Sequence, residues 1–166
     1  MATIDATTLT PDQLAPMLRA WAAGLYPSEA ALDLLVTHRF WLTRRDFLTR
    51  LVDAVDDGWG PRGAVVAMAS VDWDGVAAFL DDPAVPASSS EVAILRLAAS
   101  LAGTRIDASL MELTGCLDPT NAGRVLDALA HRFGWHEHGF SRTVTGHQDS
   151  MIGRTSASPA CEARYA

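Results

Sequence analysis

The chain has 166 residues and a mass of 17.7 kDa, which predicts one domain with a sizeable apolar core. All 13 basic residues are Arg, so the sequence offers no lysine for a Schiff base, a pyridoxal-phosphate anchor or a phosphate-binding loop. The formal net charge of −7 opposes phosphate backbones and anionic lipid, so any nucleic-acid site would have to be local.

The first part of the sequence predicts three amphipathic helices. A capping box at Thr10 and Gln13 opens the first helix, which ends before Gly24. Pro27 and Ser28 open the second. The third begins after Thr43, and its apolar positions predict a buried face made of Phe47, Leu48, Leu51, Val52 and Val55.

The middle of the sequence contains the strongest helix breakers. Three glycines and a proline in residues 58–63 predict a hinge or a tight surface loop. The apolar run 64–69 fits either a short strand or the start of a buried helix, because periodicity does not separate the two at this length. A further helix is expected over 72–80.

Three helices are predicted in the second part. Ser88 and Glu91 form a capping box for a nearly all-apolar helix over 89–102, which is expected to be central. Asp107 is expected to cap a short helix over 108–114. Asp118 and Pro119 open the last helix, whose apolar positions continue to Phe133.

Together these elements predict an all-α fold: a single compact domain of about six or seven helices with at most a minor short strand. The domain is expected over 1–135, as two three-helix halves, 10–57 and 88–135, joined by 58–87. The remainder, 136–166, predicts a weakly structured polar tail with one short strand around 140–144.

Residues 107–133 resemble the helix-turn-helix of bacterial repressors, with a turn one residue longer at Cys116. The resemblance implies that Thr120, Asn121, Arg124 and His131 face outward into a major groove, with Arg132 near a phosphate. Asp127 would lie on that face and repel DNA, and few arginines are nearby. A DNA-binding regulator is therefore the alternative hypothesis.

A histidine cluster supports a third hypothesis. His131, His136 and His138 are candidate metal ligands, although no further ligand follows at a recognised spacing. Three pairs also match an Arg and His pattern of helical ribonucleases, a number only slightly above chance: Arg124 with His131, Arg132 with His138 and Arg142 with His147. Metal binding or nuclease activity is accordingly a third hypothesis.

The leading hypothesis is a non-enzymatic protein that binds another protein as a regulator, adaptor or complex subunit. Residues 1–90 carry 12 acids against 6 Arg, so most of the negative charge lies there. Trp59 and Trp135 each adjoin a glycine in a predicted turn and are candidate interface residues, whereas Trp21, Trp41 and Trp73 are expected in the core.

No complete catalytic motif and no cofactor site is recognised in the sequence, so no cofactor is expected. The N-terminal residues are polar and no apolar run could span a bilayer, which predicts a cytoplasmic protein without membrane contact. Homo-oligomerisation remains open. The preference for Arg and Ala over Lys indicates a high-GC bacterial gene.

Overall fold

The structure is a computed structural model that describes residues 2–60 and 63–139. Its strands and α-helices are, in chain order, β1 (Thr3–Ile4), α1 (Pro11–Ala22), α2 (Tyr26–His38), α3 (Arg45–Leu51), β2 (Val52–Trp59), β3 (Val65–Val71), α4 (Val76–Leu80), α5 (Ser89–Ala102), α6 (Leu110–Thr114) and α7 (Pro119–Arg132). Short 3-10 helices are η1 (Ala6–Thr8), η2 (Trp41–Thr43) and η4 (Trp135–His138). The strand predicted at 140–144 and most of the predicted tail lie outside the described residues.

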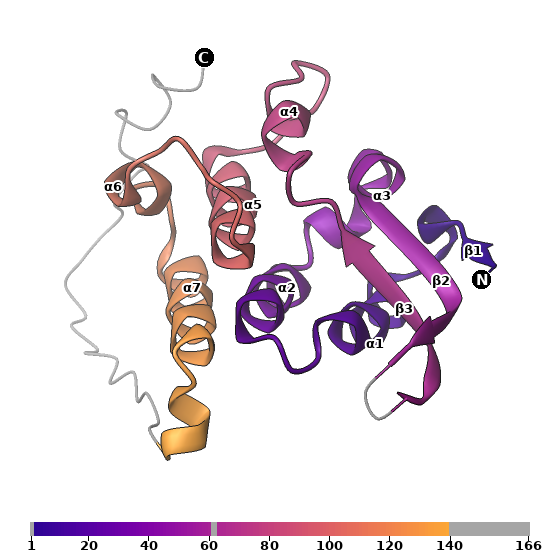
Figure 1. Ribbon diagram of the computed structural model, residues 1–166. Helices are drawn as coiled ribbons and strands as arrows, with labels where there is room; N and C mark the ends of the chain where they lie inside the picture. Colours follow the sequence, from indigo (N-terminus) through magenta and orange to yellow (C-terminus); the bar gives the residue numbers. More distant parts are fainter. Residues whose placement is uncertain (1, 61–62, 140–166) are drawn as a thin grey trace.

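The helices and the sheet occupy different sides of the molecule. Figure 1 shows the three strands at one side, α6 and α7 at the other, and α1, α2 and α5 between them. Buried side chains from Ala6 to Ala128 form a continuous apolar cluster that includes both predicted halves. Within the described part of the chain, no helix is long and apolar enough to cross a membrane.

The protein is mostly helical, as expected, but the all-α prediction is wrong because the sheet is a substantial element. The helix predicted to reach Val55 ends at Leu51, and β2 follows directly. Val52 and Ala54 of β2 are buried while Asp53 is exposed, an alternation that fits a strand with one face on the core. A helical stripe and a strand both place apolar residues at these positions, and tertiary packing favours the strand.

The sheet is a three-stranded antiparallel sheet in the order β1-β2-β3. The apolar run at 64–69, for which strand and helix were both open, belongs to β3. Val52 pairs with Val71 and Trp59 with Val65, and one irregularity in the register lies between Val55 and Gly58. The glycine-rich segment 58–63 therefore connects the two strands of a hairpin.

Several helix starts are confirmed at the predicted residue. Thr10 and Ser88 each take part in a complete capping box, and the Asp118 side chain accepts the Asn121 N–H at the start of α7. The start of α6 differs, because Ser109 rather than Asp107 is its N-cap. The Ser109 hydroxyl and Glu112 carboxylate form a reciprocal capping box there, an arrangement Asp107 would be two residues too early to make.

Candidate functional site

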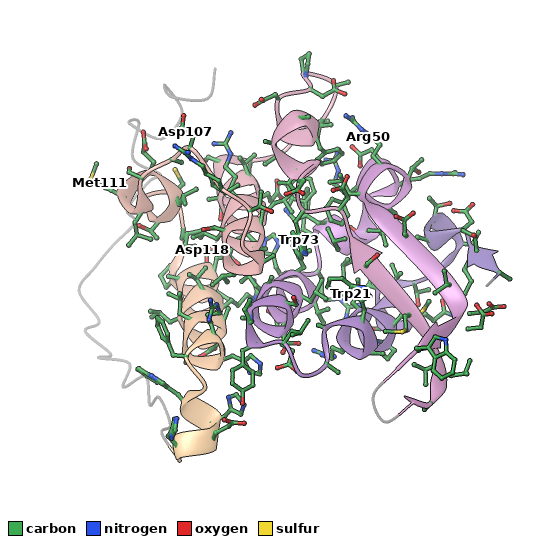
Figure 2. All side chains as sticks on the ribbon, in the orientation of Figure 1. Trp21, Arg50, Trp73, Asp107, Met111 and Asp118 are labelled. Carbon is green, nitrogen blue, oxygen red and sulfur yellow. The ribbon has the colours of Figure 1, made fainter. Side chains whose placement is uncertain are left out.

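Two tryptophans from different elements line one hollow beside the β2–β3 hairpin. Trp21 lies near the end of α1, and Trp59 is the last residue of β2. The hollow has a volume of about 510 Å³ and is lined by Trp21, Asp53, Val55, Gly58, Trp59, Met68, Ala69 and Ser70. Figure 2 shows Trp21 on α1 at the side of the molecule that carries the sheet. We call this feature the tryptophan hollow.

The two indoles differ in exposure. Trp59 is 78% exposed, as its predicted role at an interface requires, and Trp21 is 38% exposed. The expectation that Trp21 belongs to the core is therefore wrong: the buried side chains of α1 are Leu14, Met17, Leu18 and Ala22. Trp41 and Trp73 are buried, as expected. Trp21 follows Leu14 and Met17 at helical spacing, so periodicity alone assigns it to the buried face.

Gly58 shapes one wall of the hollow. A Cβ at this position would lie 2.4 Å from the Sδ of Met68 on the paired strand, closer than any real contact. The absence of a side chain at Gly58 lets the Met68 thioether lie across β2 at the irregularity in the ladder. A side chain at this position would therefore require the Met68 side chain to shift.

Among the described residues that line the hollow, one is charged, the carboxylate of Asp53. Four of the six arginines in residues 1–90 are paired with acids: Arg19 with Asp33, Arg39 with Asp12, Arg44 with Asp46 and Arg50 with Asp82. Their charges are therefore compensated locally. Indole faces and a carboxylate together favour an organic cation such as an arginine or lysine side chain.

Trp135, the second predicted interface tryptophan, lies elsewhere. It begins η4 after α7 and is 42% exposed. Figure 1 shows the end of α7 and the β2–β3 hairpin on different sides of the molecule. Trp59 and Trp135 therefore do not form one surface.

The helix-turn-helix interpretation puts Thr120, Asn121, Arg124 and His131 on an outward face of α7 and Arg132 near a phosphate, but in the structure three of the four outward residues contact other parts of the protein. Asn121 is only 7% exposed, and its amide donates to Ser90 Oγ and Asp118 Oδ2. The Arg124 guanidinium donates to Asn121 Oδ1 at 2.6 Å. His131 Nε2 lies 2.7 Å from Glu29 Oε2 on α2.

These contacts arise because α7 packs against α2 and α5 along the proposed DNA-reading face. Of the five residues, only Thr120 and Arg132 are exposed, and Asp127 is exposed with them. A DNA backbone would meet little positive charge on this side of α7. DNA binding itself stays an untested alternative.

The histidine cluster is partly assembled. The rings of His131 and His136 stack with centroids 4.6 Å apart and planes 6° apart, and Tyr26 meets both rings edge-on. These side chains and Glu29 line a hollow of about 370 Å³. His138 is not among its lining residues, and residues 2–60 and 63–139 contain no group of three or more His, Cys, Asp or Glu arranged to hold a metal ion.

Hydrogen bonds shift the pKa values of two groups in this cluster, Glu29 and Tyr26. Partial burial acts to raise the pKa of Glu29, but the Gly24 N–H and His131 together hold it below its ordinary value. A hydrogen bond to Glu137, with burial, raises the pKa of the Tyr26 phenol. These contacts connect α2 with α7 and η4, so the cluster is a polar contact between packed helices.

An apolar groove on the other flank of α7 was not predicted. It has a volume of about 530 Å³ and is lined by α5, α6 and α7. Leu110 and Met111 of α6 are 69% and 70% exposed, and Figure 2 shows Met111 projecting outward from α6. The apolar stripe of α7 is wider than one packing face, so Leu126 and the C-cap residue Phe133 stay exposed. The width of that apolar stripe is the feature of the sequence that indicates an exposed apolar groove.

The chain was compared with protein-family models, curated protein sequences and solved structures, and none of them matches it.

Proposed function

We propose that this chain is a non-enzymatic protein-binding domain, and that its partner presents a cationic segment to the tryptophan hollow. The observation that carries the proposal is the meeting of Trp21, Trp59 and Asp53 in one open hollow. Exposed tryptophans are frequent anchors of protein interfaces. Their combination with a carboxylate specifies which side chains of a partner would fit.

The charge distribution supports the same partner chemistry. Residues 1–90, which contain the whole hollow, carry 12 acids and 6 Arg. A cationic partner would be attracted over a distance of about 8–10 Å at physiological ionic strength, and each cation above an indole face adds roughly 0.5–2 kcal/mol. Binding of this kind is expected to weaken as salt is added.

A peptide titration tests the proposal. A labelled peptide of alternating Arg and Thr, seven residues long with blocked ends, is titrated with the protein and followed by fluorescence anisotropy. We expect binding that weakens at least tenfold in Trp59→Ala and about threefold in Asp53→Asn, because a cation–π contact and a charge are removed. The same peptide with Glu in place of Arg is expected not to bind.

A second exposed tryptophan provides the matched control. Trp135→Ala removes a half-exposed indole far from the hollow, so it is expected to leave the affinity within twofold of the wild type. Equal losses in Trp59→Ala and Trp135→Ala, or no binding of the Arg peptide at low salt, would overturn the proposal.

A further inference from the structure

The apolar groove beside α7 leaves large hydrophobic side chains exposed. Its described lining residues, which come from α5, α6, α7 and the adjoining loops, include no charged side chain. Leu110 and Leu126 of the lining are 69% and 49% exposed, and Phe133, at the end of α7, is 64% exposed. Contiguous apolar surface of this kind usually marks a place where another segment binds.

Two points of the chain lie at the two ends of this groove. Cys116 lies in the turn between α6 and α7, next to Leu117 of the lining. It is disulfide-bonded, and the single chain contains one other cysteine, Cys161. The described residues end at Gly139, beyond the opposite end of α7. A segment that leaves Gly139 and returns to Cys116 must therefore pass along the length of α7.

We propose that residues 140–160 occupy the apolar groove, and that Cys161 is the disulfide partner of Cys116. The 14 residues of α7 extend over about 21 Å. The proposed occupant would extend over roughly 31 Å as a helix and about 70 Å as an extended chain, so either conformation is long enough. This surface is separate from the tryptophan hollow, and the inference goes beyond the proposed function.

The composition of the C-terminal segment fits this position. Phe140, Val144, Met151 and Ile152 supply apolar side chains for an uncharged groove. Residues 140–166 carry 3 Arg and 2 acids, a net charge of +1, whereas residues 1–139 carry 10 Arg and 18 acids, a net charge of −8. A second copy of the chain would instead bring a further −7, so charge favours the chain's own segment. Covalent attachment also raises its local concentration to the millimolar range.

Methyl NMR of the full, disulfide-bonded chain tests the proposal. The Ile, Leu, Val and Met methyl groups are labelled, and the chain contains five Met. We expect nuclear Overhauser contacts from Met151 or Ile152 to Leu126 or Leu129. Ile4 of β1, which lies on the other side of the molecule (Figure 1), is the internal control and should show no contact with these two leucines.

Proteolysis supplies a second readout, because trypsin cleaves after Arg142 and Arg154 within the segment. Leu126→Asp places a charge in the groove, so we expect cleavage at these arginines to become at least tenfold faster. Leu25→Asp changes a leucine of similar exposure, 57%, at the start of α2 and serves as the matched control. Its cleavage rate should stay within twofold of the wild type.

The disulfide pairing is checked in the same samples. A complete tryptic digest without reductant should contain residues 106–124 linked to 155–164 from one chain. Disulfide-linked dimers, or methyl contacts found only between differently labelled copies, would identify a second copy as the occupant and overturn the proposal. The absence of the methyl contacts, or equal cleavage rates in the two variants, would overturn it as well. None of these outcomes affects the proposed function, which depends on the tryptophan hollow.

Discussion

Trp41 donates its indole N–H to the main-chain carbonyl of Glu91 at 2.9 Å, although the two residues are 50 positions apart. Trp41 is completely buried, and its ring meets Phe47 and Phe79. Glu91 lies in the first turn of α5, where its carboxylate also accepts the Ser88 N–H. The bond therefore fixes the entry of the central helix against η2.

Replacing Trp41 with Phe is expected to lower the free energy of unfolding by about 1–3 kcal/mol. The variant loses the hydrogen bond and leaves space beside two aromatic rings. Urea denaturation at neutral pH measures the change. Trp59→Phe, at an exposed position, is expected to stay within about 0.5 kcal/mol of the wild type, and a similar loss in both variants would contradict this account.

Asn121→Ala is expected to destabilise the protein by about 1–3 kcal/mol, because the buried amide serves Ser90, Asp118 and Arg124. Thr120→Ala changes the neighbouring exposed residue and should alter stability by at most about 0.5 kcal/mol. Thermal unfolding compares the two. If Asn121→Ala instead preserves stability and abolishes a salt-dependent DNA mobility shift, Asn121 acts in DNA binding and its structural role is contradicted.

His38 makes stability depend on pH. Burial, and next the positive charge of Arg124, lower the pKa of His38, while Glu91 and Asp118 act in the opposite direction. Its Nδ1 is buried without a hydrogen-bond partner among the described residues. Because the unfolded chain binds a proton more readily, the folded state loses stability as pH falls below about 6.5 and keeps it above.

His38→Gln is expected to flatten this dependence between about pH 7.5 and 5.5, above the range in which most carboxylates titrate. Urea midpoints at several pH values measure it. His138→Gln changes an exposed histidine and should keep the wild-type profile. A steep loss of stability that persists in His38→Gln would assign the effect to other groups.

Gly58→Ala is expected to cost about 1–3 kcal/mol, since the new methyl group must displace the Met68 side chain. Affinity for the Arg peptide should fall with it, because Met68 lines the tryptophan hollow. Adding Met68→Ala should recover part of the stability, and the double-mutant cycle measures this coupling. Gly123→Ala, where a Cβ meets no atom within 4 Å, serves as the non-disruptive control.

Local signals in the sequence located helix starts better than they located the sheet. Thr10, Ser88 and Asp118 are caps whose hydrogen bonds span three residues, so their chemistry is visible without knowledge of the fold. The strand after Leu51 depends on its pairing with residues as far away as Val71. That pairing, rather than local propensity, decides between helix and strand for β2.

The candidate site shows the same difference between features set by local sequence and features set by tertiary packing. Trp59 was identified because it adjoins glycines in a predicted turn, whereas the partly exposed position of Trp21 depends on how α1 meets the hairpin. The resemblance of residues 107–133 to a repressor helix-turn-helix implies an outward position for Asn121 and His131. Their burial and pairing come from α2 and α5, which periodicity within α7 does not reveal.

The uncharged sequence of β3 also bears on how the chain behaves before it has folded. A seven-residue apolar strand without charge or proline has the composition of segments that nucleate cross-β aggregates. During synthesis or partial unfolding, identical chains could stack through this segment faster than the hairpin closes. In the folded protein α1 packs along β3, so this helix covers the segment that would otherwise be exposed to another chain.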